Sequence, residues 1–349
     1  PPSQTRRSND LPRATLSVAE LVDLTMEFYR RNYIEGLFLS SGVVRNPDYT
    51  MERLVRVAKD LRTIHRFNGY IHLKSIPGAS RELVNEAGLY ADRLSVNVEI
   101  PKEENLKLLA PEKDHKSVYA PMRYIQQGVL ESSEERKKHR HAPRFAPAGQ
   151  STQMIVGATA ETDKDILYLS SALYKGPTMR RVYYSGYISV NTYDKRLPAL
   201  KQPPLVRENR LYQADWLLRF YQFKVDEIVN DAYPDLDLDV DPKLAWALRH
   251  PEVFPVDINK ADYEMLLRVP GIGVKSAKII IVSRRYANLG SEQLKKIGVV
   301  MKKASYFITC RELPTQTVNE VSPETVRQLL TRKSGKKVDD RQLILPFID

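Results

Sequence analysis

The chain has 349 residues and a formal net charge of +11 at pH 7, from 54 Lys and Arg against 43 Asp and Glu. This length predicts two domains, and the 42% hydrophobic content is typical of a globular protein with a core. The sequence contains no run of about eighteen apolar residues, as a membrane-spanning helix would need. We therefore expect no membrane partner and a cytoplasmic location. The single cysteine, Cys310, excludes internal disulfides and a multi-cysteine metal site within these residues. The positive charge favours an acidic partner such as nucleic acid.

The first two hundred residues alternate helix and strand patterns. Helices are predicted at 17–33 (capped by Ser17), 50–65, 80–88 (closed by Gly88), 118–130 and 163–175. Strands are predicted at 36–42, 70–78, 93–101, 152–160 and 180–190. This alternation predicts an α/β fold with a parallel sheet, either a barrel or a doubly wound sheet. In both architectures the chemistry lies at the carboxyl ends of the strands.

Polar residues gather at those predicted strand ends. They are Ser40, Ser41, Gly42, Ser75, Asn97, Glu99, Gly157, Glu161 and Ser185. Ordinary loop composition is the alternative to a binding role. The tyrosines Tyr183, Tyr184, Tyr187 and Tyr193 would suit the stacking of a displaced base, although alternating strand tyrosines more often pack in a core. The basic loop at 135–150 contains His139 and His141, for which a surface facing nucleic acid is favoured over a metal site.

A proline-rich segment at 197–210 marks a boundary, and we assign residues 206–325 to a helical domain and 326–349 to a flexible tail. Within this domain, residues 257–287 predict two helices separated by Pro270, Gly271 and Gly273. The amides of this turn and the start of the second helix would form an anion site sized for a phosphate. Lys275, Ser276 and Lys278 follow directly.

This segment resembles the helix-hairpin-helix motif, which implies binding to the backbone of duplex DNA. A plain helical hairpin is the alternative. A weaker second copy at 291–308 has one glycine and the pair Lys302 and Lys303. Phosphate contacts of this kind position a protein without reading sequence, and their affinity falls with salt.

Four segments together resemble a bacterial family of radical S-adenosylmethionine (SAM) proteins linked to DNA modification or repair. The segments are 6–14, 151–163, 203–221 and 254–273. The resemblance implies a partial (β/α)6 barrel over 1–205, followed by the all-α helix-hairpin-helix domain. It also implies an enzyme that acts on DNA with a [4Fe–4S] cluster and SAM, and a uracil-DNA glycosylase-like partner.

By the same resemblance, Ser40, Ser41 and Gly42 would contact the methionine amine of SAM. Asn97 and Glu99 would contact its ribose and carboxylate, and Gly157, with Glu161 nearby, would pack against its adenine. The three cluster cysteines and the first barrel strand have no counterpart in these residues. Either a preceding segment carries them or this version has lost the cluster. The alternatives to the enzyme are a DNA-binding scaffold without a cluster, which serves a repair partner, and a tRNA-modifying enzyme.

The tail ends in the sequence QLILPF at 342–347. It looks like the short peptides by which bacterial repair proteins bind the sliding clamp, with Gln342, Leu343, Leu345 and Phe347 entering pockets. A terminal strand that docks on the protein's own surface is the alternative.

Overall fold

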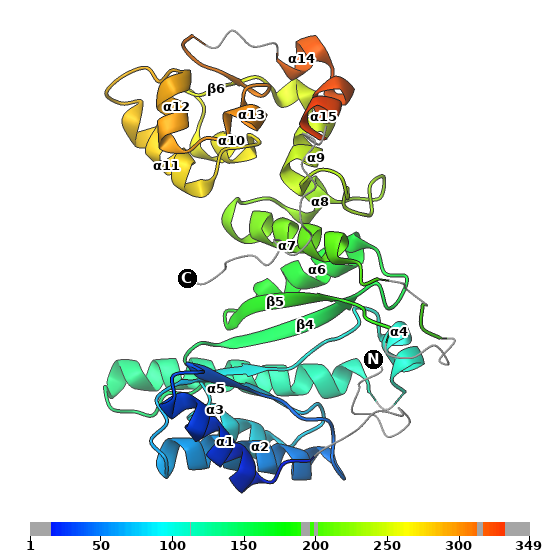
Figure 1. Cartoon of the computed structure of the whole chain (residues 1–349), viewed down its shortest axis with the longest axis vertical. Coiled ribbons are helices and arrows are strands. Elements are labelled where there is room, and N and C mark those ends of the chain that lie inside the picture. The colour runs from blue at the N-terminus through cyan, green and yellow to red at the C-terminus, as the bar shows by residue number, and fades with distance from the viewer. Residues whose placement is uncertain (1–14, 112, 190–195, 199–201, 313–316, 332–349) are drawn as a thin grey trace. The chain divides into compact units, whose positions relative to one another are not determined.

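A computed structural model describes residues 15–111, 113–189, 196–198, 202–312 and 317–331. The chain forms two compact units (Figure 1). Unit 1 contains residues up to Asp215 and the segment Val229–Asp235, and unit 2 contains Trp216–Ile228 and the residues from Leu236 onward. The division between the units therefore falls inside helix α7 (Leu205–Phe220).

Unit 1 is built on a parallel sheet of five strands, which confirms the predicted α/β class. The strands are β1 (Gly36–Leu39), β2 (Tyr70–Lys74), β3 (Arg93–Ser95), β4 (Gln150–Val156) and β5 (Met179–Gly186). Their order in the sheet is β1-β2-β3-β4-β5, the same as their order in the chain. Every neighbouring pair is parallel.

Helices connect each strand to the next. Those of unit 1 before α7 are α1 (Val18–Arg30), α2 (Pro47–Thr63), α3 (Arg81–Tyr90), α4 (Glu103–Leu109), α5 (His115–Lys138) and α6 (Asp163–Tyr174). Helix α1 packs on α2, α2 on α3 and α3 on α5, so these four form one layer (Figure 1). Ser17 caps α1, and its hydroxyl accepts a hydrogen bond from the Glu20 N–H.

The two faces of the sheet differ in chemistry. Ile71, Leu73 and Leu94 are fully buried on one face. The residues between them in each strand point the other way, because side chains alternate along a strand. Residues paired across neighbouring strands share a face, and the register pairs Phe38 with His72, Ser95 with Ser151, Ser151 with Arg181, and Gln153 with Tyr183. We call the face that carries these seven residues the open face.

Phe145 explains an error in the sequence prediction. Helix α3 does not close at Gly88 but continues to Tyr90. A Cβ on Gly88 would lie 2.2 Å from the Phe145 ring, and one on Gly128 of α5 would lie 2.6 Å from it. Both glycines therefore serve to admit this buried ring where α3 and α5 pack, and Gly88 has no capping role.

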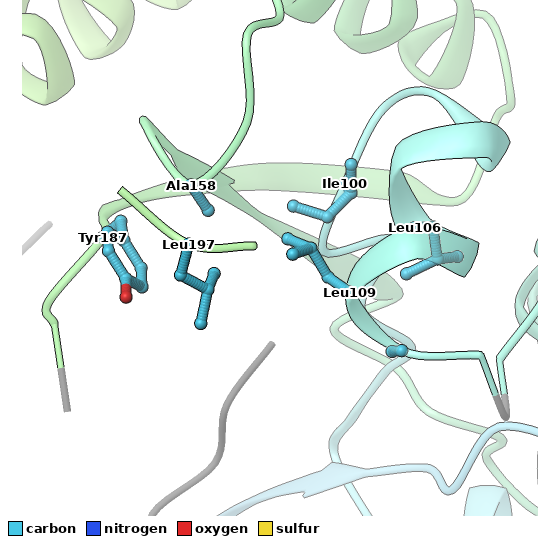
Figure 2. Close-up of a cluster of buried hydrophobic side chains, with 7 residues drawn as sticks. Ile100, Leu106, Leu109, Ala158, Tyr187 and Leu197 are labelled. Carbon is cyan, nitrogen blue, oxygen red and sulfur yellow. The ribbon is translucent and has the colours of Figure 1, made fainter. Parts of the chain in front are cut away.

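An apolar cluster lies at the carboxyl end of the sheet, where a polar rim was expected. Its members are Ile100, Leu106, Leu109, Ala110, Ala158, Tyr187 and Leu197 (Figure 2). Tyr187 is buried in this cluster and Tyr184 is buried in the core. Of the described tyrosines proposed for base stacking, only Tyr183 therefore lies on the open face.

The helices of unit 2 after α7 are α8 (Val225–Ile228), α9 (Pro242–Arg249), α10 (Tyr263–Arg268), α11 (Val274–Ser283), α12 (Ser291–Ile297), α13 (Met301–Ala304), α14 (Val318–Val321) and α15 (Pro323–Thr331). A short 3-10 helix, η1 (Pro251–Val253), follows α9. Residues 326–331, expected in the flexible tail, belong to α15, where Arg327 pairs with Asp237 and Asp239.

Unit 2 is not entirely helical, and the all-α expectation is wrong in this respect. Strands β6 (Val256–Asp257) and β7 (Ile308–Thr309) pair in parallel. The Val256 N–H donates to the Phe307 carbonyl at 2.9 Å, and the Ile258 N–H donates to the Thr309 carbonyl at 3.1 Å. The strands flank the segment α10–α13 in the chain. None of the helices in the described ranges is long and apolar enough to cross a membrane.

Candidate nucleic-acid interface and the open face of the sheet

The turn after α10 requires glycine at position 271. Gly271 has φ +89°, a left-handed conformation that disfavours other residues. A Cβ there would lie 2.6 Å from the Val300 carbonyl oxygen, and the Gly271 carbonyl accepts a hydrogen bond from the Val300 N–H at 2.9 Å. Gly271 therefore joins the two hairpins of unit 2 by close backbone packing.

Gly273 plays a different part. It is the N-cap of α11, and a Cβ there would meet only the Tyr221 hydroxyl, at 3.6 Å. The N–H groups in the first turn of a helix lack partners within the helix. The Tyr221 hydroxyl already bonds the backbone of Val274 here, so an anion would use the N–H groups that follow Val274.

Two predicted cations stand next to this helix start. Lys275 and Lys278 are exposed on α11, and within the described ranges neither forms an ion pair. Ser276, also predicted to bind DNA, is buried, and its hydroxyl donates to the Ile297 carbonyl at 3.4 Å. Ser276 thus connects α11 to the second hairpin.

The second hairpin repeats the left-handed turn. Gly298 ends α12 with φ +92°, and α13 follows. Lys302 is exposed at the start of α13, whereas Lys303 is ion-paired with Asp241 at 2.6 Å. Arg284, the C-cap of α11, donates to the carbonyls of Ile258 and Ala261 and has a structural role.

A buried lysine lies against the turn. The Lys243 ammonium donates to the Ile272 carbonyl at 2.6 Å, and its nitrogen lies 4.7 Å from the centre of the Tyr221 ring. Burial lowers the pKa of Lys243 to about 7; Asp241 opposes this shift, and Arg268 and Lys303 add to it. This ammonium was not anticipated from the sequence.

The predicted SAM-binding residues of unit 1 separate into different surroundings. Ser40, Ser41 and Gly42 line a cavity of about 510 Å³ together with the start of α1. Asn97 lines another cavity, and Glu99 pairs with Lys74 at 3.5 Å. They follow β1 and β3 of the same sheet, but they do not line a common cavity among those found in the described residues.

The remaining two predicted residues lie beyond β4. Gly157 follows the strand with φ +84°. The Glu161 carboxylate accepts hydrogen bonds from the Asn105 amide at 2.8 Å and from the Thr159 hydroxyl. Its carbonyl accepts one from Arg207 at 2.7 Å. Glu161 therefore holds the β4–α6 connection together.

The expectation of a [4Fe–4S] cluster is wrong for these residues. Cys310 is the only cysteine in the sequence, and it lies half-buried in unit 2, directly after β7. Burial raises the pKa of its thiol, whereas cluster ligands are thiolates. The described residues hold no group of three His, Cys, Asp or Glu side chains that would bind a metal ion. Because SAM would bind to that cluster, the prediction of bound SAM is withdrawn as well. We derive no reaction through either group.

The open face forms a cavity of about 400 Å³ that sequence reasoning did not identify. It is lined by Phe38, His72, Ser95, Asn97, Ser151, Thr152, Gln153, Tyr183, Tyr184, Ser185 and Tyr212. The clue in the sequence is a polar residue at every second position of a strand such as Tyr70–Lys74. Strands buried on both faces would instead be apolar throughout.

Burial lowers the pKa of His72 to about 4, helped by the charge of Arg93. The ring is therefore uncharged at neutral pH. Its Nε2 lies 3.4 Å from the Ser151 hydroxyl, and its centre lies 4.8 Å from that of the Phe38 ring. The lining of this cavity is aromatic and polar, and it contains no Lys, Arg, Asp or Glu side chain.

Comparison with protein-family models gives no matching family, and comparison with curated proteins gives no matching relative. The family resemblance therefore stays a prediction. Gln342, Leu343, Leu345 and Phe347, which were predicted to bind the sliding clamp, lie outside the described residues.

Proposed function

We propose that this protein binds the phosphate backbone of duplex DNA through the two hairpins of unit 2, without selecting a sequence. The observation that supports this most is the start of α11. There Gly273 adds no side chain at the N-cap, and the exposed Lys275 and Lys278 stand beside it without ion-pair partners in the described ranges. Lys302 on the second hairpin adds a third exposed cation.

The packing of the hairpins supports the same proposal. The Val300–Gly271 hydrogen bond and the Ser276–Ile297 contact hold the two turns together. Because both contacts are between rigid elements, the cations are carried on a fixed frame. A fixed frame reduces the conformational entropy that binding would cost.

For unit 1 we propose the partial barrel as the finer description of its fold. The strand order follows the chain order, as in singly wound barrels, and Phe38 of β1 lines the same cavity as Tyr183 of β5. A sheet whose first and fifth strands face one cavity is curved. The glycosylase-like partner and the clamp stay proposals that rest on the sequence alone.

The test measures binding to two unrelated duplexes of equal length by fluorescence anisotropy, at several salt concentrations. We expect equal affinity for both duplexes and a linear fall of log K with log [salt]. Lys275→Ala combined with Lys278→Ala should weaken binding to both and reduce the salt slope by about 1 per lysine.

Lys260→Ala is the matched control, because this lysine is exposed in the same unit but pairs with Asp257 at 3.5 Å. It should leave the affinity almost unchanged. An unaltered salt slope in the Lys275/Lys278 double variant would contradict the proposal. Stronger competition by tRNA than by duplex DNA would instead favour an RNA substrate.

A further inference from the structure

We propose that the open face of unit 1 is a binding site for a nucleobase, an inference that rests on the proposed function. Its cavity of about 400 Å³ is of the size that holds small ligands in proteins. The proposal depends on three features of the lining, which are its aromatic walls, a pair of side-chain amides and its lack of charge at the centre.

Aromatic rings line the cavity from opposite ends of the sheet. Phe38 comes from β1 and Tyr183 from β5. Tyr212 adds a third ring, whose hydroxyl is fixed by a hydrogen bond from the Tyr184 N–H at 3.0 Å and one to the Tyr184 carbonyl at 2.9 Å. Flat rings of this kind are the groups on which bases stack.

Arg181 extends this aromatic surface. Its guanidinium carbon lies 5.6 Å from the centres of both the Tyr183 and Tyr212 rings. Its Nε atom is buried without a hydrogen-bond partner among the described residues. A planar cation held in this way offers one more face for stacking and one free donor.

The floor of the cavity carries two side-chain amides. The Asn97 Nδ2 donates to the Gln153 Oε1 at 3.1 Å. That bond leaves the Asn97 oxygen free to accept and the Gln153 nitrogen free to donate, since neither has a partner in the described part of the chain. A free acceptor beside a free donor matches the edge of a base, and Asn and Gln read adenine in this manner.

The absence of charge at the centre favours a base over a phosphate. The nearest titratable ring, His72, is neutral at pH 7, and Lys74 is paired with Glu99. Arg93 and Arg181 also lie on the open face by the register, but neither lines the cavity, and the lining contains no Lys, Arg, Asp or Glu side chain. A flat and neutral group with hydrogen-bonding edges fits this lining.

The test uses the full-length protein and two kinds of probe. In the first arm, saturation-transfer NMR is recorded with each of the four free deoxynucleosides. We expect stronger saturation of base protons than of sugar protons for at least one of them. Tyr183→Ala and Gln153→Ala should each weaken the binding about tenfold, because they remove a stacking ring or a hydrogen-bonding group.

In the second arm, a duplex with one unpaired base is compared with the fully paired duplex. A base supplied by DNA predicts tighter binding of the first duplex, and Tyr183→Ala should abolish the difference. A free nucleoside as the natural ligand predicts binding in the first arm only. Tyr183→Ala should not change the affinity for the fully paired duplex, which depends on the hairpins of unit 2. A failure of the nucleobase proposal can therefore be distinguished from a failure of the proposed function.

Controls separate binding from folding. Tyr183→Phe keeps the ring and should keep the binding, and Tyr33→Ala removes an exposed tyrosine elsewhere in unit 1 and should change nothing. Circular dichroism checks that each variant folds. Absence of any nucleoside signal together with equal affinity for both duplexes would overturn the inference, as would nucleoside binding that Tyr183→Ala and Gln153→Ala leave unchanged.

Discussion

Two glycines two positions apart, Gly271 and Gly273, have separate physical roles. Gly271 needs its left-handed backbone and its close approach to Val300, whereas Gly273 has an ordinary φ of −93° and only an ordinary contact, with the Tyr221 hydroxyl, at its Cβ position. A sequence alone assigns both to one turn. The structure separates a glycine that its backbone conformation and packing require from one that neither requires.

We therefore expect opposite outcomes for the two alanine variants. Gly271→Ala should destabilise the protein by roughly 1–3 kcal/mol, through backbone strain and the contact with Val300. Gly273→Ala should cost less than about 1 kcal/mol, because it changes only an N-cap, but should weaken DNA binding. Thermal denaturation and anisotropy measure the two effects. A Gly271→Ala variant that melts like the wild type would contradict this assignment.

Lys243 makes stability depend on pH in an unusual direction. Its pKa is about 7 in the folded protein, against 10.5 for an unburied lysine. Between these values the unfolded chain holds a proton that the folded protein does not, so the contribution of Lys243 to stability rises with pH. Below pH 7 Lys243 is protonated in both the folded and the unfolded protein, so folding carries the full free-energy cost of burying its charge.

The test compares wild-type protein with Lys243→Met in thermal denaturation at pH 7, 8, 9 and 10. The stability of the wild type should increase relative to that of the variant across this range. Asp241, Arg268, Lys303 and Tyr221 surround the ammonium and are present in both proteins. Parallel stability profiles would show that Lys243 does not titrate here.

At the scale of the elements, the packing of α3 on α5 depends on one ring and two glycines. Phe145→Ala should cost roughly 3–5 kcal/mol as a large-to-small core substitution. Gly88→Ala should destabilise the wild type, because the new methyl group would enter the ring. In the Phe145→Ala background the same change should stabilise, because alanine favours a helix over glycine by about 1 kcal/mol.

A double-mutant cycle on these four proteins, measured by denaturant unfolding, checks this reversal of sign. Gly128→Ala provides a second cycle from the α5 side of the ring. If Gly88→Ala changed stability equally in both backgrounds, the Phe145 ring would not be the reason that position 88 requires glycine.

The elements also show which parts of the fold could be predicted from the sequence. Local patterns predicted the parallel strands and the turn at Gly271, since alternation and helix-stop residues are local signals. The role of Gly88 depends on Phe145, which is remote in the chain. The pairing of β6 with β7 involves two residues in each strand, too few for any alternation to show.

At the scale of the whole molecule, the cavity of the open face was not predicted because it forms only when distant parts of the chain come together. His72 lies on β2, Gln153 on β4 and Asn97 two residues after β3, and only the arrangement of the sheet brings them to one cavity. The sequence prediction placed the binding residues at the strand ends instead, in a region where the structure has the apolar cluster of Figure 2. The turns of the hairpins were easier to predict because each is formed by adjacent residues.

The units do not correspond to two continuous stretches of chain. Val229–Asp235 belongs to unit 1, although Trp216–Ile228 before it and the residues after it belong to unit 2. In this segment the Asp235 carboxylate accepts a hydrogen bond from the Asp163 N–H at 2.9 Å, and the Pro234 carbonyl accepts one from the Lys164 N–H at 2.8 Å. The start of α6 is therefore stabilised by residues that come after α7.

The strand order has a consequence for synthesis on the ribosome. Each strand from β2 to β5 pairs with the strand before it, so the sheet can extend in the order in which residues emerge. The partners of Asp163 and Lys164 appear only with Pro234 and Asp235, after the sheet is complete. The hairpins emerge later still, and β6 must wait for β7. A nascent chain can therefore assemble its sheet before the hairpins that we propose to bind DNA have emerged.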